Sequence, residues 1–333
     1  MTKKSLLAAL ALGAAGALAL AGCSSPAPSP SASPSDDAGS ESYRIGISQL
    51  AQHPALDAIA TGFQKAFTDA GVEADFDLQN ASAEQANATT IANKFKSDKV
   101  DLVLAIATIS AQTAAQAISD IPIVFAGVTD PVDAGLVESW EAPGSNVTGT
   151  SDLNPVEEQL KLIKDVQPDA KSIGIIYSSG EPNSQVQVDM AKAASEKLGL
   201  EIKESAIADS RDIAQAAEGL GDIDAIYVPT DNKIVEALES VIQFGESKKV
   251  PIYGTEDSQV ERGSVASYGI NYEKMGELSG RMALDILQKG EKPATMPVQT
   301  LTDLTLVINP AAAERMGLTF SDAIVARAER SVE

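Results

Sequence analysis

Cysteine, histidine and tryptophan each occur once in the 333-residue sequence, and aromatic residues make up only 4% of it. The single cysteine, Cys23, excludes a disulfide within the chain and a zinc site built from several thiolates. The single histidine, His53, excludes a site with two or more imidazole ligands, so we predict no metal centre. We expect His53 either to contact a ligand or to cap a loop, and not to serve as a catalytic base.

The motifs of common enzyme and nucleotide sites are also missing. The sequence has no Walker-type phosphate loop, no GxSxG nucleophile elbow, no GxGxxG fingerprint and no EF-hand calcium loop. Residues 45–48 and 173–176 each contain one glycine, which is too few for a phosphate cradle. We therefore predict that the protein is not an enzyme and uses no cofactor.

Basic residues are scarce relative to acidic ones. The 25 Lys and Arg are outnumbered by 47 Asp and Glu, which gives a formal net charge of −22. Nucleic acid and anionic membrane surfaces would repel such a protein, so we exclude them as partners. The apolar content of 44% is enough to bury one large core or two ordinary ones.

The N-terminus carries a processing signal. Lys3 and Lys4 precede an apolar run over residues 5–20, which is shorter than a comfortable membrane-spanning helix. The sequence Leu-Ala-Gly-Cys at 20–23 then matches the bacterial lipobox, whose cysteine receives diacylglycerol. We predict a signal peptide over 1–22, acylation of Cys23, and attachment to the outer face of the cell membrane. Residues 23–42 are rich in Ser, Pro and Ala and indicate a disordered tether.

From Tyr43 onward, short apolar runs alternate with helical patterns, which is typical of βαβ units around a parallel sheet. Strands are predicted at 44–48, 75–79, 102–107 and 123–126, and again at 172–177, 201–206, 225–228 and 251–253. The helices between them are predicted at 55–70, 83–97 and 111–119, and then at 183–198, 213–220 and 234–248.

The second half of the sequence repeats the order of the first. Residues 99–108 parallel 222–231, and residues 121–127 parallel 250–254. We therefore predict an α/β protein with two doubly wound parallel-sheet lobes, joined by a hinge and facing a cleft. Lobe 1 takes residues 43–151 and about 269–289, and lobe 2 takes 152–268 and about 290–333. We interpret residues 128–152 as a loop that ends in a crossover.

Polar residues gather just after the predicted strands, at the sheet edge where ligands bind in open α/β folds. Any one of them could instead cap the following helix, but clusters at matching places in both halves favour a shared site. Hydroxyls and helix N-termini suit a carboxylate and acidic residues suit an ammonium, so we predict a small zwitterionic ligand. The candidates are Ser48, Gln49, His53, Thr108, Thr129 and Asp130 in lobe 1, and Ser178, Ser179, Glu181, Asn183, Ser184, Asp231, Asn232 and Glu256 in lobe 2.

Two questions about this site stay open in the sequence. The ligand carboxylate could be held by Thr108 with Thr129, or by Ser179 with Ser184. The ring partners of an aromatic ligand could be Phe125, Tyr177 or Tyr227, although each could equally be a core residue of its strand.

Five segments, taken together, carry a family resemblance. They are residues 121–132, 143–149, 180–184, 229–232 and 266–272. In them the chain resembles the tryptophan/tyrosine-type family of ABC-transporter substrate-binding lipoproteins, over nearly all of residues 43–320. The resemblance implies a type I periplasmic-binding fold, delivery to an ABC permease and its ATPase, and often an aromatic amino acid as ligand. It places the cleft at Thr129-Asp130, 178–184 and Asp231-Asn232. The chain departs from the family pattern at Pro182, where Ala is usual, and at Asn271, where Asp is common.

We therefore predict an extracytoplasmic solute-binding lipoprotein of an ABC importer. It would hold a small zwitterion, best an aromatic amino acid, between the lobes, and by its class it would be a monomer. A ligand-sensing subunit for a membrane receptor or kinase would use the same cleft. A nucleobase or sugar ligand would keep the importer role and change only the solute.

Overall fold

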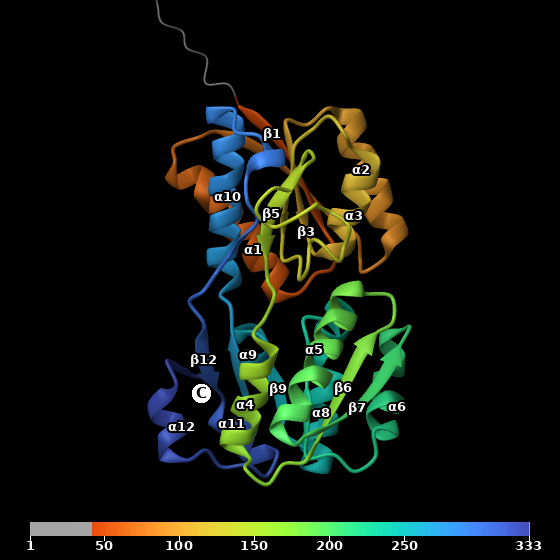
Figure 1. Cartoon of the computed structure of the whole chain (residues 1–333), viewed down its shortest axis with the longest axis vertical. Coiled ribbons are helices and arrows are strands. Elements are labelled where there is room, and N and C mark those ends of the chain that lie inside the picture. Colours follow the sequence, from red (N-terminus) through yellow and green to blue (C-terminus); the bar gives the residue numbers. More distant parts are fainter. Residues whose placement is uncertain (1–41, 333) are drawn as a thin grey trace, which may run out of the picture. The chain divides into compact units, whose positions relative to one another are not determined.

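The computed structural model describes residues 42–332 (Figure 1). The predicted signal peptide, Cys23 and nearly all of the predicted tether lie outside the described residues. None of the helices within 42–332 is long and apolar enough to cross a membrane.

The first lobe is built on a sheet of six parallel strands, in the order β11-β5-β4-β3-β1-β2. Apolar runs form the central strands because helices cover both faces of the sheet. The strands are β1 (Tyr43–Gln49), β2 (Ala74–Asn80), β3 (Leu102–Ile106), β4 (Ile123–Ala126), β5 (Val147–Ser151) and β11 (Gln299–Thr300). The helices are α1 (Pro54–Asp69), α2 (Gln85–Asp98), α3 (Thr108–Ala117) and α10 (Tyr272–Lys289), with a 3₁₀ turn at η2 (Pro293–Thr295).

The second lobe is built on a sheet of seven strands, in the order β13-β12-β10-β9-β8-β6-β7, in which only the β10–β12 pair is antiparallel. Its strands are β6 (Ser172–Ser178), β7 (Glu201–Ile207), β8 (Ala225–Tyr227), β9 (Ile252–Gly254), β10 (Ala266–Gly269), β12 (Thr305–Ile308) and β13 (Arg330–Ser331). Its helices are α4 (Val156–Val166), α5 (Pro182–Leu198), η1 (Ser210–Asp212), α6 (Ile213–Gly219), α7 (Asn232–Glu236), α8 (Leu238–Lys248), α9 (Asp257–Glu261), α11 (Pro310–Arg315) and α12 (Asp322–Arg327).

The two sheets repeat one topology, which confirms the predicted fold class. The order β2-β1-β3-β4-β5 in the first lobe matches β7-β6-β8-β9-β10 in the second. In both, the strand order reverses beside the first strand of the lobe, and this reversal opens a crevice at the carboxyl ends of the strands. The chain passes between the sheets at 152–155, 270–271 and 301–304.

Two details of the predicted organisation are wrong. Residues 147–151, interpreted as part of a loop, form β5 beside β4. Residues from about 290 were assigned to the second lobe, yet β11 pairs with β5 and Val298 packs in the first core. Threonine, glycine and serine fill most of β5, and β11 has only two residues, so neither strand shows an apolar alternation in the sequence.

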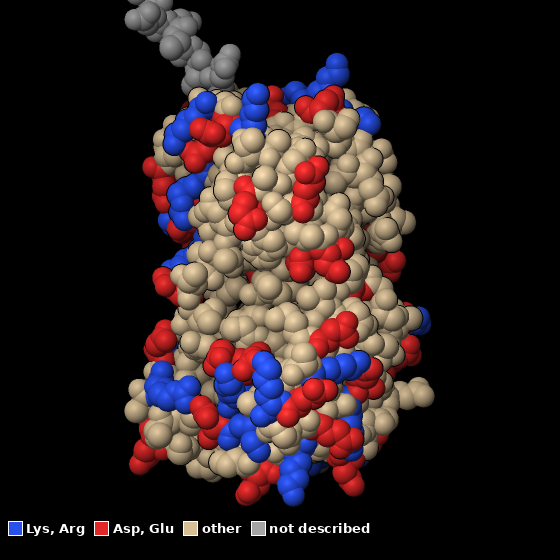
Figure 2. Space-filling view, viewed as in Figure 1, with Lys and Arg blue, Asp and Glu red and all other residues tan. Residues whose placement is uncertain are grey.

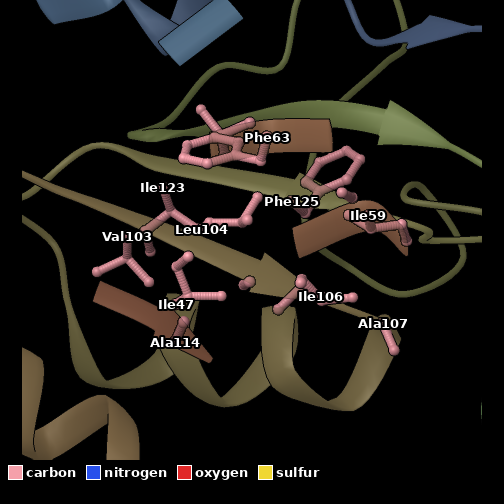
Figure 3. Close-up of a cluster of buried hydrophobic side chains, with 14 of the residues drawn as sticks. Ile47, Ile59, Phe63, Val103, Leu104, Ile106, Ala107, Ala114, Ile123 and Phe125 are labelled. Carbon is pink, nitrogen blue, oxygen red and sulfur yellow. The ribbon is translucent and has the colours of Figure 1, made fainter. Parts of the chain in front are cut away.

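Each lobe has its own hydrophobic core. In the first, strands β1, β3 and β4 lie between α1 on one face and α3 on the other (Figure 3). Helices α1 and α10 approach very closely, because a Cβ built at Gly62 would lie 2.0 Å from the Glu273 carbonyl oxygen. One built at Gly276 would lie 2.1 Å from the Ile59 carbonyl oxygen. Glycine therefore permits the contact that holds α10 to the first lobe.

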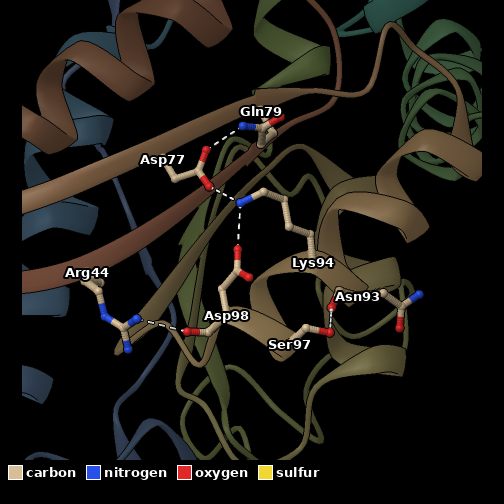
Figure 4. Close-up of polar contacts among 7 residues, drawn as sticks. All are labelled: Arg44, Asp77, Gln79, Asn93, Lys94, Ser97 and Asp98. Carbon is tan, nitrogen blue, oxygen red and sulfur yellow. Dashed lines mark hydrogen bonds and ion pairs between the residues drawn. The ribbon is translucent and has the colours of Figure 1, made fainter.

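Charged side chains lie mostly at the surface. Lys and Arg, Asp and Glu gather over the upper and lower parts of the view in Figure 2, and the band between them is mostly uncharged. A representative cluster joins Lys94 Nζ to Asp98 Oδ2 at 2.7 Å and to Asp77, near the Arg44 contact with the Asp98 carbonyl oxygen (Figure 4). Solvent exposure limits what such pairs contribute to stability.

Candidate functional site

A small cavity lies at the carboxyl ends of strands from both sheets. The first lobe and the crossing segments supply residues that follow β1, β4, β5 and β10, and the second lobe supplies residues that follow β6, β8 and β9. The lining residues are His53, Leu56, Gly127, Thr129, Asp152, Asn183, Thr230, Asp231, Asn232, Val235, Glu256 and Tyr272. Among the described residues, no group of three or more His, Cys, Asp or Glu side chains is placed to hold a metal ion.

The structure brings most of the sequence-predicted residues to this region. Six of them line the cavity: His53, Thr129, Asn183, Asp231, Asn232 and Glu256. Thr108 and Asp130 line a smaller neighbouring cavity, which Asn183 shares and which is too narrow to hold a water molecule. The remaining six, Ser48, Gln49, Ser178, Ser179, Glu181 and Ser184, line neither cavity.

Several of these side chains, and the neighbouring Ser110, have a buried polar atom without a hydrogen-bond partner in the described part of the chain. Such an atom costs about 1–3 kcal/mol, and native proteins leave few of them. The atoms are Ser48 Oγ, Gln49 Oε1, His53 Nδ1, Thr108 Oγ1, Ser110 Oγ and Asn183 Oδ1. All lie just at or after the carboxyl ends of β1, β3 and β6, where the two lobes face each other.

The backbone is strained at the same place. Ala107, between β3 and α3, has φ +76°, a left-handed conformation that alanine rarely adopts. It precedes Thr108 and Ser110 on the first turn of α3, and no side chain caps this helix N-terminus. Strain of this kind costs about 1–3 kcal/mol and is often found at binding sites.

Asp231 and Glu181 are held inside the second lobe. Asp231 accepts from Ser178 N at 2.5 Å, Ser184 Oγ at 2.7 Å and Ile234 N at 2.9 Å, and so caps α7. Burial and the neighbouring Glu181 raise the pKa of Asp231, and the three donors oppose that rise. Glu181 accepts the backbone N–H groups of Asn232 and Lys233, each at 3.0 Å.

Asp152 and Tyr272 line the cavity and were missed in the sequence. Asp152 Oδ1 accepts from Thr129 Oγ1 at 3.0 Å, and its Oδ2 accepts from the Tyr272 hydroxyl at 2.9 Å. Asp152 follows the unpredicted strand β5, and Tyr272 opens α10 after β10. The signal that could have found Asp152 is its place after 147–151, had that run been read as a strand.

The acidic side chains of the cavity have no basic neighbour in its lining. Neither Lys nor Arg is among the lining residues drawn from 42–332. Burial raises the pKa of Asp152, although its two hydroxyl donors oppose this, and burial raises the pKa of Glu256 to about 7. Arg262 lies close enough to lower the pKa of Glu256 slightly. The cavity therefore favours a cationic group.

The three suggested ring partners are core residues. Phe125 and Tyr227 are fully buried in the first and second cores, and Tyr177 packs against the second. The Tyr227 hydroxyl donates to Gln159 Oε1 at 2.7 Å. None of the three lines the cavity, whose apolar surface comes from Leu56, Val235 and the ring of Tyr272.

The two departures from the family pattern are accommodated locally. Pro182 occupies the first turn of α5, where its missing N–H has no cost. The Asn271 side-chain oxygen caps α10 by accepting from Lys274 N at 2.9 Å, a role that Asp also performs.

Comparison with known proteins gives one consistent family. The model of the family described as ABC transporter substrate binding protein matches residues 44–332. A "Tyrosine-binding protein" of Clostridioides difficile (strain R20291) is 44% identical over 270 residues, which is 80% of this chain and 78% of that protein.

Two solved structures differ in how closely they match the shape of this chain. The L-Trp complex of an ABC domain from Streptococcus pneumonia has a TM-score of 0.84 at 36% identity, covering 87% of this chain and all (100%) of that one. A ligand-free, open substrate-binding protein with adhesive properties from Clostridium difficile has a TM-score of only 0.67, at 42% identity and with 87% and 99% coverage. The chain is therefore closer in shape to the L-Trp complex than to the more identical open structure.

Proposed function

We propose that this chain, which belongs to the ABC transporter substrate binding protein family, binds an aromatic L-amino acid between its lobes. Members of this family are extracytoplasmic binding proteins rather than enzymes, and they serve a permease and its ATPase. The relatives that bind tyrosine and L-Trp support the class of ligand. Closure is favoured by the ligand because contacts to both lobes exist only in the shut form.

The observation that carries this proposal is the set of unpartnered polar atoms at the strand ends that face the other lobe, of which those of His53, Thr108 and Asn183 belong to cavity-lining residues. Nine buried side-chain atoms lack a partner among residues 42–332, and six of them lie at the ends of β1, β3 and β6. Asp152 and Glu256 have no cation in the cavity lining. A zwitterion supplies both kinds of partner at once, because its carboxylate accepts from hydroxyls and its ammonium donates to oxygens.

The free donors and acceptors support one orientation of the ligand. Thr129, Ser179 and Ser184 already donate to Asp152, the Ile207 carbonyl oxygen and Asp231. The unpartnered hydroxyls of Thr108 and Ser110 remain, beside the uncapped N-terminus of α3. Our proposal places the carboxylate there, on the first lobe.

The ammonium is placed on the opposite side. Asn183 Nδ2 donates to the Thr230 carbonyl oxygen at 2.8 Å, so its unpartnered Oδ1 is a free acceptor on a residue that lines both cavities. Together with Asp152 and Glu256 it supplies three oxygens for an ammonium. Leu56, Val235 and Tyr272 are left to contact the ligand ring.

Calorimetry on protein stripped of ligand by unfolding and refolding tests this function. L-tyrosine, L-tryptophan and L-phenylalanine should be titrated beside leucine, glutamate, adenine and glucose. We expect saturable binding of at least one aromatic amino acid. Binding of adenine or glucose alone would overturn the choice of ligand. An Asp152→Asn variant that binds as tightly as the wild type would overturn the ammonium site.

We also propose that the chain is a monomer anchored by lipid on Cys23, with residues 23–42 as the tether. The support is the lipobox and the composition of the tether. Metabolic labelling with an alkyne fatty acid should mark the wild-type chain and not Cys23→Ala, and light scattering of the soluble part should give a single-chain mass. Equal labelling of both chains refutes the anchor.

A further inference from the structure

We propose that Glu181 and Asn232 fix one tautomer of His53, so that its ring presents a hydrogen-bond acceptor which the ligand must meet with an N–H or O–H donor. This inference rests on the proposed function and adds a requirement on the ligand. His53, the N-cap of α1, belongs to the first lobe, and Asn232, the first residue of α7, belongs to the second.

The orientation of the Asn232 amide is the first step. Both Glu181 oxygens already accept a backbone N–H, Oε2 from Asn232 and Oε1 from Lys233. Asn232 Nδ2 lies 2.6 Å from Glu181 Oε2, so the amide must turn its NH₂ group toward the carboxylate. Its Oδ1 then points away from Glu181, toward the first lobe.

The tautomer of His53 follows from that orientation. His53 Nε2 lies 3.3 Å from Asn232 Oδ1, and because a carbonyl oxygen only accepts, Nε2 must carry the proton. Burial lowers the pKa of His53 to about 4, with Arg262 lowering it further and Asp57 and the Asn232 bond opposing. Asp57 itself accepts from Gln49 Nε2 at 2.7 Å. The ring is therefore neutral at pH 7, and its Nδ1 carries no proton.

The exposed fraction and surroundings of His53 make this acceptor consequential. The side chain is only 6% exposed, and Nδ1 has no partner among residues 42–332. His53 lines the cavity beside Leu56, with Asn232 and Val235 across from it. A donor on the ligand removes the cost of the unpaired acceptor, whereas a ligand without a donor there leaves the cost in place.

This contact also joins recognition to closure. The His53–Asn232 bond crosses between the lobes. When the lobes separate, this bond is lost and either ring nitrogen of His53 can carry the proton. Glu181 and Asn232 act as positioning residues, since they act through His53. The ligand donor is either its ammonium or a polar group of its ring, namely the tyrosine hydroxyl or the tryptophan indole N–H.

Nuclear magnetic resonance of the ring tests the tautomer directly. Because the chain has a single histidine, labelling with ¹⁵N-histidine gives the two ring nitrogens of His53 alone. With L-tryptophan or L-tyrosine bound at pH 7, we expect a neutral ring protonated at Nε2. Glu181→Gln frees the Asn232 amide to turn over, so the bound ring should become a mixture of tautomers even if the melting temperature hardly changes. A ring protonated at Nδ1, or charged, in the bound wild type overturns the inference.

Ligand analogues show which donor meets the ring without changing the protein. We compare L-tyrosine with L-phenylalanine, L-tryptophan with 1-methyl-L-tryptophan, and L-tryptophan with indole-3-propionate, which lacks the ammonium. Removing the donor that meets Nδ1 should weaken wild-type binding about tenfold to a hundredfold, and His53→Leu should reduce that ratio severalfold.

The outcomes separate the two proposals. Ratios that are the same in wild type and His53→Leu overturn the acceptor role while the proposed function stands. If no aromatic amino acid binds the wild-type chain, the proposed function fails, and the inference fails with it.

Discussion

Replacing Glu256 with glutamine should stabilise the ligand-free protein at pH 8 and at the same time remove most of its affinity for an amino acid. Glu256 is 3% exposed and lines the cavity with Asp152. Its Oε1 accepts from Ser258 Oγ at 2.9 Å, a bond that the glutamine oxygen can keep. The substitution thus removes a buried charge with little change in shape.

The magnitude follows from the pKa of Glu256, which burial raises from 4.5 to about 7. In the unfolded chain this carboxyl loses its proton near 4.5, whereas in the folded chain it keeps the proton until about pH 7. The contribution of Glu256 to the unfolding free energy is therefore fully present below pH 4.5 and is lost as pH rises through about 7. The difference between the folded and unfolded pKa values corresponds to about 3 kcal/mol of unfolding free energy, which the wild type loses at high pH and the glutamine variant keeps.

Urea unfolding of the ligand-free wild type and Glu256→Gln, at several pH values from 4.5 to 8, measures this effect. As the pH rises across that range, the unfolding free energy of the variant should increase relative to that of the wild type by up to about 3 kcal/mol. Asp231 has a raised pKa in both proteins, so it cancels in the comparison. The exposed Glu84→Gln is the control. Parallel pH profiles for wild type and Glu256→Gln would falsify the reasoning.

Three further predictions concern packing, the capping network and the pH dependence of binding. Gly62→Ala should cost about 2–3 kcal/mol in urea unfolding, because its Cβ meets the Glu273 carbonyl oxygen at 2.0 Å. A Cβ at Gly219 meets nothing within 4 Å, so Gly219→Ala should stabilise the protein by up to about 1 kcal/mol. An equal effect of the two substitutions refutes the packing argument. Asp231→Ala should lower the unfolding free energy by at least about 2 kcal/mol, since it removes the cap of α7 and two other bonds. A variant as stable as wild type contradicts that role. Affinity for an aromatic amino acid should fall as pH drops below about 7, where Glu256 becomes protonated. Calorimetry near pH 6 in buffers of different ionisation enthalpy should detect protons released on binding. An affinity that does not change with pH refutes this prediction.

The alternation of strands and helices, and with it the doubly wound fold, was predictable from the sequence. A buried parallel strand such as β3 must be apolar throughout, and a covering helix such as α1 must repeat its apolar residues at helical spacing. These requirements concern residues close together in the chain, so the amino-acid sequence shows them directly. The polar residues that follow the strands were found for the same reason, because strand ends of a parallel sheet meet at one edge.

The roles of the acidic residues depended on contacts between distant segments. Asp231 and Asp152 both follow a strand and line the cavity, yet Asp231 caps a helix while Asp152 accepts from the hydroxyls of Thr129 and Tyr272. Strand β5, which positions Asp152, is recognised only through its pairing with β4 and β11, since its own residues lack an apolar pattern.

By itself, the sequence determined the fold class, the family resemblance and the edge of each sheet at which a ligand would bind, because each follows from the order and type of neighbouring residues. Only the tertiary structure decided which polar atoms are left without a partner, and which tautomer His53 adopts. Those properties depend on residues that lie far apart in the chain. Glu181 meets Asn232 within the second lobe, and His53 meets Asn232 across the two lobes.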